Sequence, residues 1–245
     1  MQKFLLFQLY GPMASWGDVA VGEHRPTANH PSKSAISGLL AAARGVRRDE
    51  ENIHRDMVAG YGFGVRVDAP GELLRDYHTV QVPPAKGKVR FFTRRDELRN
   101  AELNTILSSR DYRMDACYAI AVWVKEPVAP FSLEVLKEAL QRPRLALYLG
   151  RKACPLGMPM QPQLVEAASL KSAFEAFHCL SEGSLLHILS VAQTSYYWEE
   201  LSEENAGMAA SMVYPRRDHS LNRVRWQFTE RNEFYFSESV QEGQG

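Results

Sequence analysis

Residues 3–10 are rich in Phe and Leu, with an apolar run interrupted only by Gln8, and the run stops at a Gly-Pro pair. A short apolar run bounded by turn residues is typical of a buried β-strand. After an irregular loop, Ser32 and Ser34 offer N-caps for a helix that extends to Arg44 and ends at a glycine. The chain is therefore predicted to open with a strand, a long loop and a helix.

The following segments continue this alternation of helices and strands. Residues 49–59 predict a short helix, 61–68 a strand and 72–80 a returning strand, so that the two strands form a hairpin around an Ala-Pro-Gly turn. Residues 115–125 alternate apolar and polar side chains as a half-buried strand does, and 132–140 predict a serine-capped helix. The opening order β-α-β-β is that of a split β-α-β, ferredoxin-like unit, and the predicted fold class is α+β.

The periodicity weakens in two regions. Residues 81–112 combine a Pro-Pro pair, many basic residues and little core pattern, and so long an insertion between regular elements is more often functional than a connector. Beyond Lys152, three prolines mark a boundary into a less regular stretch. We predict a ferredoxin-like domain over residues 1–152, with the insertion inside it, and a smaller C-terminal region over residues 153–245.

Charge is balanced over the whole chain but not along it. The 29 basic and 29 acidic side chains cancel, so attraction to a polyanion must come from local clusters. Three segments are locally basic, and they contain Arg75, Lys86, Lys88, Arg90, Arg94, Arg95 and Arg99, then Arg142, Arg144, Arg151 and Lys152, and then Arg216, Arg217, Arg223 and Arg225. Such clusters suit a nucleic-acid partner, although ordinary solvated loops would give the same pattern.

Other features of the sequence exclude several classes of protein. No segment approaches the roughly 20 apolar residues that cross a bilayer, and the first strand lacks a cleavage-site pattern. Cys117, Cys154 and Cys179 are far apart and form no C-x-x-C pair, which favours reduced thiols over a disulfide framework or a zinc site. Metalloprotease, serine-hydrolase, Walker and dinucleotide-binding motifs do not occur. We expect a cytoplasmic protein with no metal and no cofactor.

The loop after the first strand is the first candidate for chemistry. Its glycines and prolines hold an irregular backbone around Trp16 and Arg25. Free N–H groups at the start of the following helix, with Lys33 and Ser34, would receive a phosphate. In the alternative interpretation, Trp16 is a core side chain and the serines are ordinary caps.

Two further segments carry candidate RNA-binding residues. Arg75, Tyr77 and His78 combine a cation for phosphate with rings for base stacking, or a histidine for metal-independent RNA cleavage. Structural roles at a strand end are the common alternative. The segment Tyr148–Lys152 sets Arg151 and Lys152 after a glycine and forms a compact phosphate clamp, or a plain turn with solvated charges.

Five collinear segments resemble one family, the CasD subunits of the type I-E Cascade complex, which are RAMP proteins of the fifth Cas family. The matching stretches are LYGPMASWG, RPT with PSKSAISGLLAA and GVRRD, LRDYHTV, RDYRMDA and LYLGRKACPL, between Leu9 and Leu156. The remaining third of the chain matches the family only loosely.

This resemblance implies a RAMP-type ferredoxin-like (RRM-like) domain whose insertion, residues 81–112, forms a thumb hairpin. It implies that the protein caps one end of the complex, grips the 5′ handle of the crRNA, and kinks the strand with the thumb before target DNA is recognised. Its expected protein partners are the CasC backbone subunits and the large subunit CasA. The residues that it assigns to RNA are Arg110 and Tyr112 at the thumb base, Tyr148, Arg151 and Lys152 in the turn, and the loop around Trp16 and Arg25; Arg94 and Arg95 of the basic insertion are further candidates.

The resemblance also bears on catalysis. Some relatives cut precursor RNA with a Tyr, Lys and His set, but in the type I-E arrangement a separate subunit, CasE, performs the cleavage. We therefore expect a non-catalytic RNA-binding subunit. The alternative, a metal-independent endoribonuclease acting on repeat RNA, rests on His78.

Overall fold

The computed structural model describes residues 1–84, 90–99, 102–177, 193–222, 225 and 227–239. Lys86, Lys88, Cys179 and Arg223 lie outside these residues. The helices are α1 (Lys33–Arg44), α2 (Glu51–Gly60), α3 (Arg94–Leu98), α4 (Leu133–Gln141), α5 (Leu170–Glu175) and α7 (Glu203–Ala206). The strands are β1 (Gln2–Tyr10), β2 (Met13–Ala14), β3 (His24–Arg25), β4 (Tyr61–Ala69), β5 (Glu72–Val82), β6 (Asn104–Met114), β7 (Cys117–Val124), β8 (Gln163–Ala167), β9 (Gln193–Trp198), β10 (Met212–Asn222) and β11 (Gln227–Ser239).

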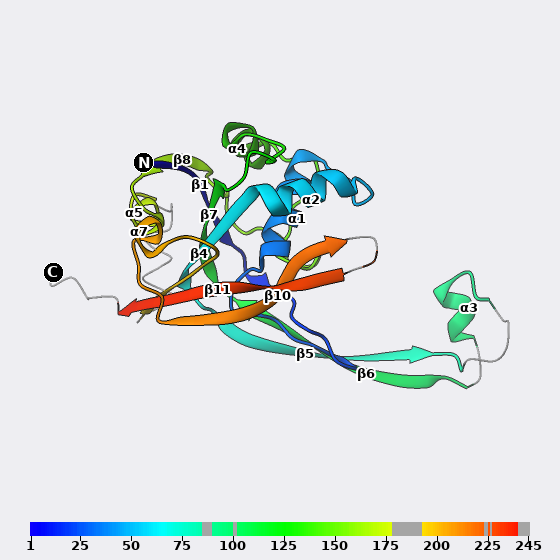
Figure 1. Cartoon of the computed structure of the whole chain (residues 1–245). Coiled ribbons are helices and arrows are strands. Elements are labelled where there is room, and N and C mark those ends of the chain that lie inside the picture. Colours follow the sequence, from blue (N-terminus) through cyan, green and yellow to red (C-terminus); the bar gives the residue numbers. More distant parts are fainter. Residues whose placement is uncertain (85–89, 100–101, 178–192, 223–224, 226, 240–245) are drawn as a thin grey trace.

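Seven strands form one antiparallel sheet in the order β10-β11-β9-β4-β7-β1-β8 (Figure 1). Strand β7 lies between β1 and β4, so the two strands that flank α1 in sequence are not neighbours in the sheet. Helix α4 then connects β7 to β8, which pairs on the far side of β1. Mixed α and β structure around antiparallel sheets agrees with the predicted α+β class. No helix among the described residues is long and apolar enough to cross a membrane.

Strand β1 is buried on both faces, which explains its nearly continuous apolar sequence. Leu5, Phe7 and Leu9 pack into one core with α1 and α4, whereas Phe4 and Leu6 point into a second core with α5. Successive side chains of a strand point to opposite faces, so a strand covered on both sides needs apolar residues at every position. The predicted first strand is confirmed.

The two serine-capped helices are also confirmed. In α1 the Ser32 hydroxyl accepts the Ala35 N–H at 3.2 Å, and Gly45 ends the helix in the left-handed region at φ 79°. In α4 the Ser132 hydroxyl accepts the Val135 N–H at 3.4 Å. These local signals are strong because each satisfies a backbone group that the helix itself leaves unpaired.

The predicted hairpin between residues 61–68 and 72–80 is wrong, although both strands exist. Strand β4 pairs with β7 and β9, whereas β5 pairs with β6 in a separate sheet. Gly71, at φ 63°, makes the change of direction between them, and its Cα approaches so closely that a Cβ there would lie 2.2 Å from the Met114 carbonyl oxygen. The turn therefore sends the chain out of the central sheet instead of back along it.

Strands β5 and β6 form a long arm that leaves the body of the molecule, with α3 near its far end (Figure 1). They pair from Glu72 opposite Met114 to Val82 opposite Asn104. The arm thus starts before the insertion that was expected over residues 81–112 and ends after it. The weak periodicity of this segment has a simple cause, since most side chains on both faces of the arm are exposed or half-buried.

The C-terminal region adds strands at both edges of the central sheet. Strand β8 extends the sheet beyond β1, and β9 extends it beyond β4. Strands from before and after residue 152 therefore belong to the same sheet. The attachment of β8 and β9 to the central sheet was not predicted, because their partners β1 and β4 lie more than a hundred residues earlier in the chain.

Buried ion pairs join these C-terminal strands to the loop and helix near residue 30. Lys33 Nζ lies 2.8 Å from a Glu199 carboxylate oxygen, and both side chains are buried. Burial lowers the pKa of Lys33 and raises the pKa of Glu199, and the ion pair between them opposes both shifts. In the same cluster Glu233 contacts His30 at 3.2 Å and Arg231 at 2.7 Å.

Glu233 makes the stability of the fold sensitive to acid. Burial raises the pKa of this carboxyl, but the hydrogen bond from His30 and the charges of His30, Arg231 and Arg216 outweigh burial and lower the pKa from 4.5 to about 2. A carboxyl with a depressed folded pKa stabilises the fold above its unfolded pKa, and this contribution of about 3 kcal/mol is lost as pH falls from about 4.5 to 2. In urea unfolding at a series of pH values, Glu233→Gln should lose stability less steeply than the wild type in this window. Parallel pH profiles would contradict the assignment.

Candidate nucleic-acid interface

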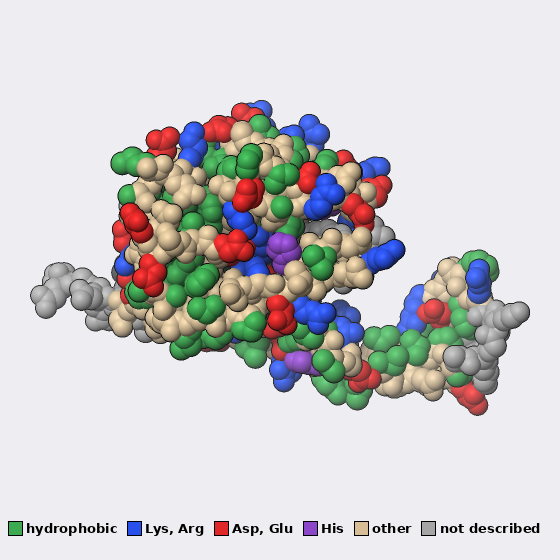
Figure 2. All heavy atoms as spheres, viewed as in Figure 1, with side chains coloured by type: hydrophobic (Ala, Val, Ile, Leu, Met, Phe, Trp, Pro, Cys, Tyr) green, Lys and Arg blue, Asp and Glu red, His purple; other side chains and the backbone are tan. Residues whose placement is uncertain are grey.

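The root of the arm is a small sheet with β6 in the middle. Strand β5 pairs along one edge of β6, and β2 and β3 pair along the other. The register places Asp76, Arg110 and Arg25 in one row across three strands. Because residues in register share a face of the sheet, Arg25 and Arg110 lie on the same face. Figure 2 shows Lys and Arg side chains gathered where the arm meets the body.

Arg151 joins these two arginines from a distant part of the chain. Its guanidinium lies over the ring of Tyr112, 4.8 Å from the ring centroid, and its Nη2 donates to the Arg25 carbonyl at 3.1 Å. Tyr112 is two positions from Arg110 in β6 and therefore on the same face, but only 8% of it is exposed. Tyr112 thus positions Arg151 by a cation–π contact and is not open to base stacking. We call Arg25, Arg110, Tyr148, Arg151 and Lys152 the root patch.

The turn that carries Arg151 is clamped to the loop after β2. Gly150 has φ 82°, and a Cβ on it would lie 1.8 Å from the Ser15 carbonyl oxygen. Ser15 donates its backbone N–H to the Leu149 carbonyl at 3.0 Å, and Tyr148 bridges to Pro155. Lys152 and Tyr148 are exposed. The glycine is therefore required for close approach of two backbones, and this approach fixes the turn from which Arg151 and Lys152 extend.

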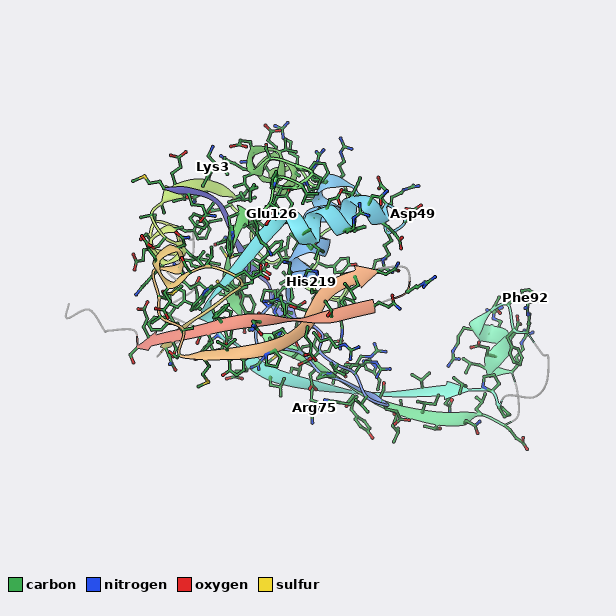
Figure 3. The ribbon with its side chains drawn as sticks, viewed as in Figure 1. Lys3, Asp49, Arg75, Phe92, Glu126 and His219 are labelled. Carbon is green, nitrogen blue, oxygen red and sulfur yellow. The ribbon has the colours of Figure 1, made fainter. Side chains whose placement is uncertain are left out.

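Arg75 lies on the opposite face of the arm. It pairs in register with Asp111, one position away from Arg110, and makes two hydrogen bonds to the Asp111 carboxylate at 2.8 and 3.1 Å. These bonds lower the pKa of Asp111. His24 contacts the same carboxylate at 3.4 Å. The structure therefore separates Arg75 from the root patch and matches its charge with a buried acid, although the side chain remains half exposed (Figure 3).

His78 follows Asp76 by two positions on the Arg110 face of the arm. Its Nε2 lies 2.5 Å from an Asp76 carboxylate oxygen, and both side chains are partly exposed. His78 and Asp76 can meet because side chains two positions apart in a strand lie on the same face. Among the described residues, no group of three or more His, Cys, Asp or Glu side chains is placed to hold a metal ion.

Besides Tyr112, the structure removes two more predicted residues from the surface. Trp16 is 4% exposed and packs edge-to-face against Tyr118, with the ring centroids 5.5 Å apart, so its role is in the core. Lys33 is buried in its ion pair with Glu199, which makes its assignment to RNA wrong. A lysine so placed offers no charge to a phosphate in solvent.

The start of α1 is not a free phosphate site either. The Lys33 N–H donates to an Asp218 carboxylate oxygen at 2.7 Å, and Ser32 caps the Ala35 N–H. Ser34 is half-buried, and its hydroxyl lies 3.1 Å from that of Ser32. The prediction of a phosphate on this helix start is therefore corrected, because an acidic side chain of the C-terminal strands already occupies it.

Arg94 and Arg95 lie at the far end of the arm, in α3. Both are exposed, and Arg94 contacts Glu97 at 2.6 Å and also donates to the Gln81 carbonyl. Phe92, directly before α3, is 92% exposed (Figure 3). The structure thus places these two cations apart from the root patch.

Sequence reasoning missed a further pair of cations, Arg47 and Arg48. They follow the glycine that ends α1 and line a cavity shared with Tyr148 and Arg151. The segment belonged to one of the five family-like motifs, but no role was assigned to it. Two adjacent arginines after a helix-ending glycine were the signal.

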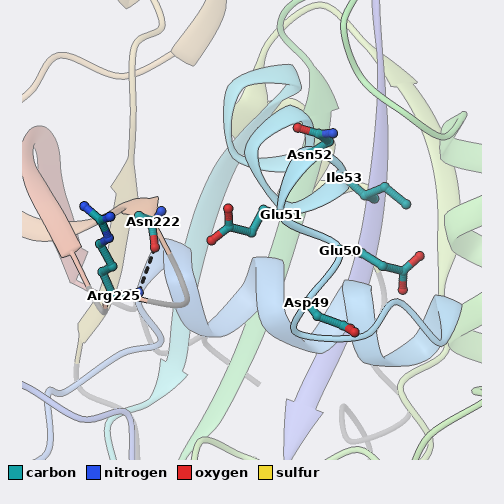
Figure 4. Close-up of a pocket in the computed structure, with 7 residues that line it drawn as sticks. All are labelled: Asp49, Glu50, Glu51, Asn52, Ile53, Asn222 and Arg225. Atoms are coloured by element: carbon teal, nitrogen blue, oxygen red, sulfur yellow. Dashed lines mark hydrogen bonds between the residues drawn. The ribbon is translucent and has the colours of Figure 1, made fainter.

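A different hollow carries the opposite charge. It has a volume of about 800 Å³ and is lined by Asp49, Glu50 and Glu51 at the start of α2, with Asn222 and Arg225 across from them. Figure 4 shows Glu51 pointing toward the Asn222–Arg225 turn. Three carboxylates against one arginine would repel the phosphates of RNA, so we do not assign this hollow to a nucleic acid.

Comparison with solved structures defines the class of the fold. One structure, described as a CRISPR RNA-guided surveillance complex, contains a chain that is 26% identical, with a TM-score of 0.66 over 97% of this chain and 90% of that chain. Another, described as the crystal structure of a Cas protein, is 27% identical, with a TM-score of 0.63 over 98% of this chain and 95% of that chain. The similarity therefore includes the C-terminal third, which the sequence motifs did not reach.

The sequence comparison gives the family. The profile of the family described as "CRISPR-associated protein (Cas_Cas5)" matches residues 4–232, and the chain belongs to this family. A curated relative, the CRISPR system Cascade subunit CasD of Escherichia coli (strain K12), is 33% identical over 161 residues, which are 65% of this chain and 70% of that protein. The resemblance drawn from the five motifs is confirmed.

Proposed function

We propose that this protein is the Cascade subunit that binds and caps the 5′ handle of the crRNA, and that it does so at the root patch. The observation that carries the proposal is the convergence of Arg25, Arg110 and Arg151 on one face, although up to 126 residues separate them in sequence. Backbone carbonyls hold the guanidinium of Arg25, and a carbonyl and a ring hold that of Arg151, while Arg110 adds a third, exposed cation. Three such groups suit successive phosphates of a single strand. The relative named above is a Cascade subunit, which supports the same role here.

The architecture fits this role. We infer that β1, α1, β4, β7, α4 and β8 form the RAMP-type ferredoxin-like domain, since their sequence order and spatial order are those of a split β-α-β unit. The arm formed by β5 and β6 is the proposed thumb. The arm is long and carries exposed cations at both ends, which suits a hairpin that bends the RNA between its handle and its spacer.

The remaining assignments follow from the family. CasC backbone subunits and the large subunit CasA are the proposed protein partners, in the cytoplasm. We propose no catalytic role. The His78 side chain is paired with Asp76. A guide RNA that neither the wild type nor His78→Ala cleaves would agree with binding alone. Cleavage by the wild type that is lost in His78→Ala would support the endoribonuclease alternative.

Two charge-removing changes test the root patch. We expect Arg110→Ala and the double change Arg151→Ala, Lys152→Ala to weaken guide retention in the assembled complex, with the slope of log K against log salt reduced by roughly one for each lost phosphate contact. Arg55→Ala, on the exposed face of α2, is the matched control and should keep the wild-type slope. Retention and slope equal to wild type in both root-patch variants would show that these residues do not contact the handle.

A further inference from the structure

We propose that the cavity beside the root patch receives one unstacked nucleobase of the handle. The inference rests on the proposed function and adds a base-binding site to the contacts with phosphate. The cavity has a volume of about 620 Å³. This size falls within the range of about 300–1,000 Å³ that is usual for sites that bind small molecules.

The lining of the cavity changes from apolar to basic toward its mouth. Leu39 and Ala41 of α1 are buried and form the floor, whereas Arg47, Arg48 and Tyr148 are exposed. An apolar floor below exposed cations and an aromatic side chain matches the two parts of a nucleotide, because the base is a flat ring system and the phosphate is an anion.

The cavity is continuous with the root patch. Ser15 and Gly150, which clamp the turn to the loop, line it together with Arg151. The Arg151 guanidinium is held in place at this edge of the cavity, because its Nη2 donates to the Arg25 carbonyl at 3.1 Å and the group lies over the Tyr112 ring. A cation that the protein already fixes loses little further freedom when it meets an anionic or polar group of a ligand.

A glycine inside α1 gives the cavity room. Gly38 lies in the middle of the helix and lines the cavity. Glycine within a helix costs about 1 kcal/mol relative to alanine, so this position is suboptimal for helix stability alone. A missing side chain at the cavity wall is consistent with space that another molecule fills.

The charge of the lining favours a nucleotide over a protein side chain. Arg47, Arg48 and Arg151 line the cavity, and none of the described residues that line it is acidic. An apolar side chain of a partner protein would need no such cations. A base within a stack cannot reach a recessed pocket, so the handle would leave its stack at this one nucleotide.

Filling the cavity without changing its charge tests the inference. Gly38→Met adds a flexible apolar side chain at the wall and replaces a poor helix former by a good one. Ala59→Met, at an exposed position of α2, is the matched control. The full chain is assembled with its partner subunits on guides in which each handle nucleotide in turn is abasic.

We expect the wild type to lose about tenfold in retention when one particular base is removed, and to change little at the other positions. Gly38→Met should bind the intact guide about tenfold more weakly than Ala59→Met and should no longer respond to removal of that base. Equal retention by Gly38→Met and Ala59→Met would overturn the inference. Weaker subunit assembly by Gly38→Met in the absence of RNA would also overturn it, because the cavity would then hold a protein side chain.

The salt slope separates this inference from the proposed function. Suppose that Arg110→Ala reduces the salt slope but Gly38→Met retains the guide as well as Ala59→Met does. The handle-binding proposal would then stand, and only the base site would be rejected. A wild-type slope in the root-patch variants would remove the handle-binding role itself.

Discussion

Gly150→Ala is expected to weaken guide retention at least tenfold while the central sheet stays folded. The new Cβ would lie 1.8 Å from the Ser15 carbonyl oxygen, and φ 82° is unfavourable for alanine. The turn or the loop must therefore move, and either movement pulls Arg151 away from Tyr112 and from the Arg25 carbonyl. Loss of one positioned guanidinium is enough for a tenfold effect, which corresponds to about 1.4 kcal/mol.

A glycine far from the root patch separates the causes of such an effect. Gly207 has φ 69° at the end of α7, and a Cβ there would lie 2.4 Å from the Ser169 hydroxyl oxygen, so Gly207→Ala adds both backbone strain and a clash. This variant should keep guide retention within about threefold of wild type, or about 0.7 kcal/mol. Equal losses in Gly150→Ala and Gly207→Ala would mean that general destabilisation, not the position of Arg151, controls retention.

Lys33→Ala is expected to lower the free energy of unfolding by about 3–5 kcal/mol, because it leaves a buried carboxylate without its counter-ion. Glu199 is 2% exposed, and its other oxygen accepts the Phe63 N–H at 3.1 Å. Urea unfolding followed by circular dichroism measures the change. Lys33→Met combined with Glu199→Gln removes both charges but keeps an acceptor for Phe63, and it should recover most of the lost stability.

An exposed ion pair provides the control for Lys33. Lys3 contacts Glu134 at 3.1 Å with both side chains nearly half exposed, and Lys3→Ala should change the free energy of unfolding far less than Lys33→Ala does. In the folded double variant at Lys33 and Glu199, the salt slope of guide retention should equal that of wild type. A smaller slope would mean that Lys33 reaches the RNA after all, which its burial contradicts.

The elements that the sequence predicts well are those with local causes. Strand β1 and helix α1 follow from apolar runs and caps within a few residues of one another. The pairing partner of β4 cannot be predicted in this way. Strand β4 pairs with β7, and the whole β5–β6 arm separates these two strands in the sequence. An Ala-Pro-Gly turn between two apolar segments has the pattern of a hairpin even when the second segment enters another sheet.

In the candidate site, too, features with local causes are predictable and those that depend on distant partners are not. Arg25 and Arg151 are visible in the sequence as cations in or after Gly- and Pro-containing turns, and the family resemblance assigns both of them and Arg110 to RNA. The opposite orientation of Arg75 could not be seen, because it depends on the register of β5 against β6, and a shift of one residue exchanges the faces. The burial of Lys33 was hidden for a similar reason, since its partner Glu199 is 166 residues away.

Crosslinking within the assembled complex tests the central claim most directly. The full chain is combined with its partner subunits and a guide RNA that carries a photoreactive nucleotide at each handle position in turn, and the joined peptides are identified by mass spectrometry. We predict handle crosslinks to the peptides that contain Arg25, Arg110 and the Tyr148–Lys152 turn. Handle crosslinks confined to other subunits, with none in these peptides, would contradict the assignment of the root patch to the 5′ handle.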